Sequence, residues 1–255
     1  MAIKNMLGHT LDLLGEAIAS GHYPPGTAIP PETVLCESYG VSRTVVREAI
    51  KSLVAKGMIS TGPKVGTRVL EADQWNWFDP QLVGWLTKVG MTRAFLRDLQ
   101  ELRSLVEPAA VGMAASRATP EDIAHLEAAY AGMQAAIEFG GDYVRHDLLF
   151  HQGLMRASHN RMMIQMSKAI GALLRTSFEI STSKPNGPAN SLPLHRAVLD
   201  AVIAQKPERA ERAARKLIDD AHDDIELVLA SRRKLPSLAT PAPPIKGRRR
   251  SPSPA

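Results

Sequence analysis

Apolar residues recur every three to four positions in the first twenty residues of the chain, as on one face of a helix. The series consists of Leu7, Leu11, Leu14 and Ile18. It predicts an amphipathic helix over residues 4–20, ended by Gly21. Two shorter helices are predicted next. One starts at the prolines of 30–31 and stops at Gly40, and the other is capped by Ser42 and runs to about Lys56.

The pattern then changes to two short strand-like segments, residues 58–61 and 67–70, with turn residues between them. Three helices followed by a small hairpin are typical of a winged helix-turn-helix, whose second motif helix enters the major groove of DNA. We therefore assign residues 1–73 to a winged helix-turn-helix DNA-binding domain.

From Asp79 onward almost every segment has the periodicity of a helix. Helices are expected near 79–89, 92–117, 120–138, 141–157, 161–181, 191–205 and 207–232. We assign residues 74–91 to a linker helix and residues 92–233 to an all-helical effector-binding and dimerisation domain. Residues 234–255 are rich in Pro, Ser and Arg, and a disordered basic tail is expected there. The expected fold class is mainly α, a winged helix-turn-helix with a small β-hairpin plus a helical bundle.

Charge is unevenly distributed along the chain. The net charge is +5, but residues 232–255 alone contain seven basic and no acidic side chains. Two interpretations of this tail stay open, nonspecific attraction to DNA phosphates and a solubilising end without a role. Residues 41–70 contain six Lys and Arg against the single acidic residue Glu48. This segment therefore predicts a locally positive surface.

Several classes of protein are excluded by composition. Apolar runs are much shorter than the ~18 residues of a membrane-spanning helix, and the first ten residues do not resemble a signal peptide. Cys36 is the single cysteine, which excludes an intramolecular disulfide. We expect a cytoplasmic protein without a membrane partner.

The third predicted helix carries the candidate DNA contacts. Arg43 and Arg47 lie one turn apart, and arginine can bind guanine through two hydrogen bonds. Ser42 and Thr44 can contact phosphates or bases, and Lys64, in the turn of the hairpin, can reach the backbone or the minor groove. The alternative is that these are solvated charges on a surface helix.

Residues 7–70 resemble the GntR family of transcriptional regulators. The matching segments are Pro24–Thr27, Ile29–Glu32, Val41–Ala49, Leu53, Gly57 and Gly66–Thr67. The resemblance implies that operator DNA is bound by Ser42, Arg43, Thr44, Arg47, Lys64 and Gly66. Thr33 stands where relatives often have an arginine that contacts DNA, and residues 64–66 read Lys-Val-Gly instead of two glycines around a basic residue. Both departures bear on operator sequence or affinity and not on the fold.

A candidate metal site lies in the second half of the chain. Asp147 and His151 are four residues apart on one predicted helix, so their side chains lie on the same face. Together with His195 and His222 from two later helices, they would form a set suited to Zn²⁺, Ni²⁺ or Mn²⁺. The spacing alone leaves surface or core histidines as the ordinary alternative.

Residues 92–230 resemble the helical ligand-binding domain in the FadR branch of the same family. The segments that carry the resemblance are Glu101–Arg103, Glu107–Pro108, Asp147–His151, Ser158–Asn160, His195 and Ala221–His222. In many members the corresponding four positions hold a divalent metal, for which Zn²⁺ is our first expectation. The resemblance thus favours Asp147 and His151 over Asp142 and His146, which have the same spacing.

The effector is expected to be a small organic acid. Its carboxylate and α-hydroxyl can occupy open positions on the metal, and Arg103 can add a charge-assisted hydrogen bond. Asn160 and Arg175 are further candidate contacts. For Arg103 the alternative is a pair within its helix with Glu107, which is compatible with a role in ligand binding. Residues 74–79 and 103–109 resemble a subgroup of the family that responds to sugar acids, which makes D-galactonate the expected effector.

The sequence therefore predicts a homodimeric repressor of a sugar-acid operon that binds a palindromic operator. Three alternatives stay open. The chain could sense another hydroxy- or dicarboxylic acid, or be a metal-dependent hydrolase of a sugar acid or lactone, since a metal with an open position can activate water. The helical part could also be a dimerisation module without a ligand. We expect no enzyme, because no separate general base is evident and a DNA-binding domain is attached.

Overall fold

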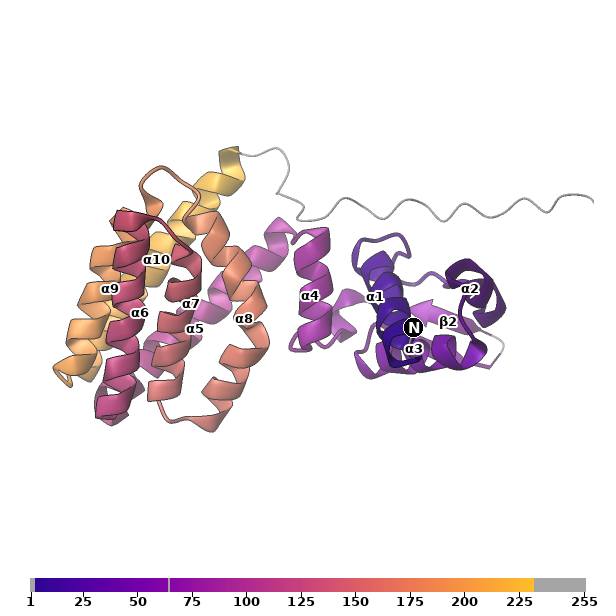
Figure 1. Cartoon of the computed structure of the whole chain (residues 1–255), viewed down its shortest axis with the longest axis horizontal. Coiled ribbons are helices and arrows are strands. Elements are labelled where there is room, and N and C mark those ends of the chain that lie inside the picture. Colours follow the sequence, from indigo (N-terminus) through magenta and orange to yellow (C-terminus); the bar gives the residue numbers. More distant parts are fainter. Residues whose placement is uncertain (1–2, 64, 232–255) are drawn as a thin grey trace, which may run out of the picture. The chain divides into compact units, whose positions relative to one another are not determined.

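A computed structural model describes residues 3–63 and 65–231 (Figure 1). The chain divides into two compact units, with the boundary in the sequence between Gly90 and Met91. Lys64 and the basic tail lie outside the described residues. Within the described part of the chain, no helix is both long enough and apolar enough to span a membrane.

The first unit consists of three helices followed by a two-stranded hairpin and one further helix. Its elements are α1 (Ile3–Ala19), α2 (Glu32–Tyr39), α3 (Arg43–Ala55), β1 (Ile59–Gly62), β2 (Gly66–Val69), the 3₁₀ helix η1 (Ala72–Gln74) and α4 (Pro80–Val89). The strands pair antiparallel, with Ile59 opposite Val69. Gly40 has a φ of 65° and turns the chain from α2 into α3, a conformation that glycine adopts without strain. The predicted winged helix-turn-helix is confirmed.

Helix α4 packs as part of the first unit. Trp75, Leu82 and Trp85 are buried in the same core as Leu14 of α1. The indole Nε1 of Trp85 donates to Asp12 Oδ1 at 2.9 Å. The segment 74–91, which we expected to be a linker helix, thus packs with the first unit up to Gly90, because its tryptophans and leucine complete that core.

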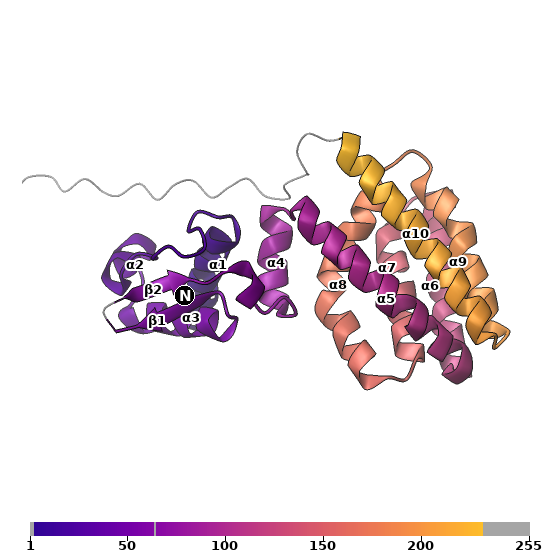
Figure 2. The ribbon, with the colours of Figure 1, turned by 180° about the vertical axis from the view of Figure 1, so that it is seen from behind.

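The second unit is a bundle of six helices (Figure 2). They are α5 (Arg93–Arg117), α6 (Pro120–Phe139), α7 (Tyr143–Ala157), α8 (Arg161–Ser181), α9 (Gly187–Ile203) and α10 (Pro207–Ser231). Helix α10 packs along α5 and against α9, while α7 packs against α5, α6 and α8. The predicted all-helical domain is confirmed.

Local signals set the ends of these helices. Thr119 and Asp122 form a reciprocal capping box at the start of α6, as the sequence Thr-Pro-Glu-Asp predicts. Helix α9 begins at Gly187 rather than near residue 191, because Pro188 occupies its first turn, where a missing N–H costs nothing.

Candidate functional site

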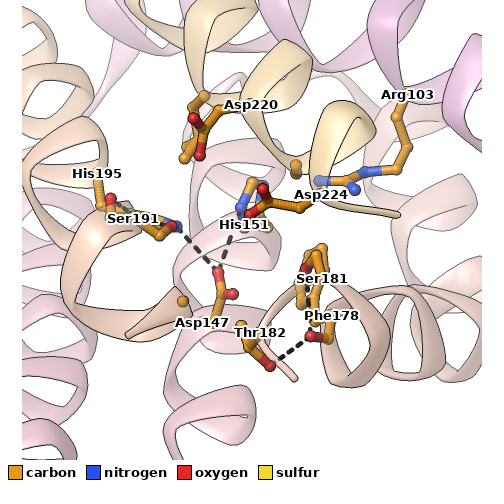
Figure 3. A pocket seen from close by; sticks show the side chains of 13 residues that line it. Arg103, Asp147, His151, Phe178, Ser181, Thr182, Ser191, His195, Asp220 and Asp224 are labelled. Carbon is orange, nitrogen blue, oxygen red and sulfur yellow. Dashed lines mark hydrogen bonds and ion pairs between the residues drawn. The ribbon is translucent and has the colours of Figure 1, made fainter. Parts of the chain in front are cut away.

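Helices α7 and α9 bring one carboxylate and two imidazoles together inside the second unit (Figure 3). Asp147 and His151 lie one turn apart on α7, and His195 comes from α9. His195 Nε2 lies 3.0 Å from Asp147 Oδ1, and His151 Nε2 lies 3.4 Å from the same oxygen. All three residues are buried, and one potential ligand atom of each lies within 4.8 Å of the others.

The second ring nitrogen of each histidine is held by an acceptor. His151 Nδ1 lies 2.7 Å from Glu107 Oε2, and His195 Nδ1 lies 3.0 Å from the backbone carbonyl oxygen of Ser191. An ionised carboxylate and a carbonyl can only accept, so each Nδ1 carries a proton and donates it. The Nε2 atoms of both rings are thereby directed toward Asp147.

Glu107 also connects His151 to Arg103. Arg103 Nε donates to Glu107 Oε1 at 2.7 Å, and Arg103 Nη1 donates to Gln100 Oε1 at 3.1 Å. Burial acts to raise the pKa of Glu107, but the charges of Arg103 and His151 outweigh burial and lower this pKa to about 2. Glu107 is therefore ionised between its two donors at neutral pH.

The surroundings of His151 favour a positive charge. Burial disfavours the imidazolium, but Glu107 and Asp147 outweigh burial and raise the pKa of His151 to about 9. Burial acts to raise the pKa of Asp147, but His195 and His151 outweigh burial and lower it. The cluster therefore attracts a cation, either a proton or a metal ion, to the point where the carboxylate and the Nε2 atoms meet.

This donor set fits a divalent transition metal. Ligand atoms bound at 2.0–2.2 Å to a tetrahedral metal lie about 3.3 Å apart. The two separations between Nε2 and Asp147 Oδ1, 3.0 and 3.4 Å, match this spacing. Two imidazoles and a carboxylate suit Zn²⁺, Ni²⁺ and Mn²⁺, and three protein ligands leave coordination room for a small molecule.

A pocket adjoins the cluster, with an empty volume of about 350 Å³ that includes the part open to solvent. Arg103 of α5 lines it, with its guanidinium 4.8 Å above the ring of Phe178. Helix α10 contributes Asp220 and Asp224. The hydroxyl residues of the lining are Ser181, Thr182 and Ser191. The lining thus combines one cationic side chain with acidic and hydroxyl groups.

Three of the four predicted metal ligands come together, and His222 does not join them. Among the described residues, the pocket is lined by Ala221 and Asp224 of α10 but not by His222. Successive residues of a helix point about 100° apart, so His222 lies to one side of the pocket face of α10. Its role as fourth ligand stays a prediction.

Arg103 lines the pocket, whereas Asn160 and Arg175 are not among the described residues that do so. Asn160 caps α8, and its Oδ1 accepts from the backbone N–H groups of Met162 and Met163. Arg175 donates to Glu179 Oε1 at 3.0 Å and to Asp142 Oδ2 at 3.1 Å on an exposed surface. Both side chains are thus engaged in contacts of their own. Asp142 also caps α7.

Sequence reasoning did not assign a site role to Glu107, Asp220 or Asp224. The signal for the two aspartates is their spacing with Leu217 and Ala221, which places all four on one face of α10. The spacing of Glu107 and Arg103 at i,i+4 predicted their pairing. The contact of Glu107 with His151 joins residues 44 positions apart, and spacing along one helix does not predict it.

The first unit presents the predicted DNA contacts on its surface. Arg43 and Thr44 are exposed at the start of α3. Ser42 is the N-cap of this helix, with its hydroxyl accepting from the Val45 N–H at 3.4 Å. Arg47 Nε donates to Glu32 Oε2 of α2 at 2.9 Å. An exposed surface of this kind is what a recognition helix requires.

The turn of the wing depends on Gly66. This residue is exposed and has a φ of 73°, a conformation that side chains rarely adopt. A Cβ atom at Gly66 would meet nothing within 4 Å. Glycine is therefore required here for the backbone conformation and not for space.

Comparison with known families and proteins agrees with this division of the chain. Residues 8–69 match the model of bacterial regulatory proteins of the gntR family, and residues 98–220 match the FCD domain. The chain is 34% identical over 207 residues to the galactonate operon transcriptional repressor of Escherichia coli K12, covering 80% of this chain and 90% of that protein. It is 27% identical over 222 residues to the Glc operon transcriptional activator of the same strain, covering 82% and 86%.

A solved structure supports the fold. Lar, which controls the expression of the Listeria monocytogenes agr system, has a TM-score of 0.61 and 18% sequence identity. The match covers 87% of this chain and 96% of that one.

Proposed function

Because the chain belongs to the GntR family of bacterial regulatory proteins and carries an FCD domain, we propose that it represses a sugar-acid catabolic operon. In this proposal an aldonic acid such as D-galactonate, bound at a divalent-metal site, releases the protein from its operator. The chain is a transcriptional regulator and not an enzyme, since the matched families and the similar proteins are transcriptional regulators.

The observation that carries the effector proposal is the meeting of Arg103 with a metal-binding cluster in one pocket. A bound divalent ion supplies a Lewis-acidic attachment point for carboxylate and hydroxyl oxygens. Asp147, His151 and His195 would hold it, and Zn²⁺ is the ion that we propose. We retain His222 as a fourth ligand because α10 brings the neighbouring Ala221 to the pocket.

The acidic and hydroxyl groups of the lining favour a polyhydroxylated monocarboxylate over a dicarboxylate. Asp220 and Asp224 can accept hydrogen bonds from hydroxyl groups, and Asp220 repels a second carboxylate, whereas Asp224 is already paired with Lys184. The hydroxyls of Ser181 and Thr182 donate to the backbone carbonyl oxygen of Phe178 and can still accept, and Ser191 adds a third hydroxyl. An aldonate has one carboxylate and a row of hydroxyls, which matches this combination of groups. The relative named as a galactonate operon repressor supports the same class of ligand.

For the first unit, we propose that α3 reads operator DNA through Arg43 and Arg47, with Ser42, Thr44 and the wing residues Lys64 and Gly66 as further contacts. We also propose that the protein acts as a homodimer, because a two-fold symmetric protein matches the two half-sites of a palindromic operator.

The test is thermal unfolding of the full chain against three ligands with the same six-carbon skeleton. D-galactonate has one carboxylate, galactarate has two, and galactitol has none. Each is added to Zn²⁺-loaded and to chelator-treated protein. We expect galactonate alone to raise the midpoint, and only with the metal present, since binding to the native state stabilises it. Stabilisation by galactarate would overturn the preference for one carboxylate, and no shift from any sugar acid would overturn the effector class.

A second measurement tests the regulatory step. Operator DNA obtained by selection from random duplexes is labelled, and its binding is followed by fluorescence anisotropy while galactonate is added. Release of the DNA supports a repressor relieved by its effector. Tighter binding would instead indicate that the effector promotes DNA binding.

A further inference from the structure

Glu107 lies between two groups that the proposed function uses for different purposes. One carboxylate oxygen accepts from Arg103, which faces the effector pocket, and the other accepts from His151, a metal ligand. Both contacts measure 2.7 Å, and the Glu107 side chain is only 8% exposed. Charged hydrogen bonds of this length are strong and directional.

On the side of the metal, Glu107 fixes which ring nitrogen of His151 is available. With its proton on Nδ1 held by Glu107, the ring presents Nε2 toward Asp147. His195 also presents Nε2 toward Asp147, because its Nδ1 donates to the neutral backbone carbonyl of Ser191. The acceptor of His151 is a full negative charge, which also makes the ring a better electron donor to a metal.

On the side of the effector, Glu107 fixes the guanidinium of Arg103. It binds Nε, while Gln100 binds Nη1 and the ring of Phe178 lies against the guanidinium plane. Gln100 is itself held, since its Nε2 donates to Ser177 Oγ at 3.1 Å. Arg103 therefore has little rotational freedom, and a change at Glu107 reaches both Arg103 and His151.

We propose that Glu107 is a positioning residue that couples effector binding to metal binding. It aligns His151 for the metal and Arg103 for the effector carboxylate, so that each ligand binds more tightly when the other is present. This inference rests on the proposed function. By linkage, the factor by which Zn²⁺ strengthens galactonate binding equals the factor by which galactonate strengthens Zn²⁺ binding.

The test compares Glu107→Gln with Glu179→Gln in the full chain. Glu179 accepts from Arg175, also at i,i+4, but on an exposed surface. Zn²⁺ affinity is measured by competition with a chromophoric chelator, with and without D-galactonate. We expect Glu107→Gln to lower Zn²⁺ affinity by about 10- to 100-fold, as is usual for loss of a residue that orients a metal-bound histidine. The coupling factor should fall below that of the wild type but stay above one, because the effector still contacts the metal directly, and Glu179→Gln should match the wild type.

The double variant Arg103→Met/Glu107→Gln covers the case in which Glu107→Gln alone does not fold. It removes both buried charges together, so no uncompensated charge is left inside, and it should also lose Zn²⁺ affinity. Arg103→Met alone keeps the contact between Glu107 and His151. It should lose galactonate binding while keeping Zn²⁺ affinity within about threefold, much less than the loss expected for a residue that orients a ligand.

The outcomes separate this inference from the proposed function. Wild-type affinity for Zn²⁺ and unchanged coupling in Glu107→Gln would overturn the role of Glu107 and leave the metal-dependent sensor intact. Failure of the wild-type protein to bind Zn²⁺ would overturn both.

Discussion

Glu32 and Arg47 join the two helices of the helix-turn-helix through a hydrogen-bonded ion pair of 2.9 Å between α2 and α3. The pair engages Arg47 through Nε. It therefore orients the guanidinium on the surface where DNA is expected to bind. Because both side chains are partly exposed, the pair itself adds little to stability. Its main effect is on the direction of the arginine.

We expect Arg47→Ala to lower operator affinity by about 10- to 100-fold, the loss typical of a good arginine–guanine contact. Glu32→Gln should lower it only a few-fold, because Arg47 remains but is less well oriented. Fluorescence anisotropy at fixed salt measures both. Glu48→Gln is the matched control, since Glu48 pairs with Lys51 on the exposed face of α3. Tighter operator binding by Glu32→Gln would show that the pair competes with DNA.

A pair between Asp79 and Lys56 makes the first unit sensitive to acid. Asp79 caps α4 and also accepts from Lys56 Nζ at 2.8 Å, where the side chains are 20% and 11% exposed. Burial acts to raise the pKa of Asp79, but Lys56 and the backbone N–H groups of Leu82 and Gln81 outweigh burial and lower it below 3.8. A lowered pKa in the folded state stabilises the unit above pH 3.8, and this contribution is lost as the pH falls further.

Asp79→Asn keeps a good helix cap but removes the charge that faces Lys56. At neutral pH it should destabilise the first unit by about 1–3 kcal/mol, the cost of leaving a buried polar partner unsatisfied. The difference from wild type should shrink as the pH falls below 4. The three tryptophans of the chain, Trp75, Trp77 and Trp85, all lie in the first unit, so their fluorescence reports its unfolding in the full chain. A difference that did not depend on pH would contradict this assignment.

Two glycines of α1 should respond oppositely to alanine. A Cβ at Gly15 would lie 2.5 Å from the ring of Trp85, whereas a Cβ at Gly8 would meet nothing within 4 Å. Gly15→Ala should destabilise the unit by about 1–3 kcal/mol through overpacking. Gly8→Ala should stabilise it by about 0.5–1 kcal/mol, because alanine favours the helix. Urea unfolding followed by tryptophan fluorescence measures both, and equal effects would show that α4 does not pack on α1.

Metal removal should destabilise the second unit. At a free Zn²⁺ concentration a hundred times the dissociation constant, binding contributes about 2.7 kcal/mol. This corresponds to a midpoint about 5–10 °C higher than in chelator-treated protein. His195→Gln and Asp147→Asn should abolish the shift. Calorimetry gives the midpoints, and a shift retained by both variants would place the metal elsewhere.

Competition with a chromophoric chelator, which measures Zn²⁺ affinity, decides whether His222 is a metal ligand. We expect His222→Gln to lower Zn²⁺ affinity by at least about tenfold if it completes the coordination, as for other substitutions at metal sites. His159→Gln is the control, since its half-exposed ring contacts Asp122 instead of the metal cluster. An unchanged affinity in His222→Gln would leave three protein ligands and a further open position.

The sequence predicted those features that depend on neighbouring residues. The capping box at Thr119 and the stop at Gly40 are local signals, and the structure has both. The same reasoning would have identified Asn160 as a helix cap, because asparagine directly before a helical segment is a frequent N-cap. It would also have paired Arg175 with Glu179 at i,i+4. Reading these two as effector contacts passed over their local partners.

Contacts between residues that are far apart in the sequence were not predicted. The spacing of Asp147 and His151 places them on one face of a helix, but it does not show which helix packs against that face. Glu107 faces them because α5 packs against α7. Residue spacing cannot provide such a contact, since it follows from how the whole bundle packs.

Hydrogen bonds and ion pairs join the helices that line the pocket. Helices α5, α7 and α9 are cross-linked by the hydrogen-bonded chain from Arg103 to His195. Helix α10 is joined to the same group, because Asp224 forms an ion pair with Lys184, just before α9, and Glu226 forms one with Arg97 of α5. Helix α5 starts three residues after Gly90. A ligand in the pocket therefore contacts, at Arg103, the helix through which the chain enters this unit.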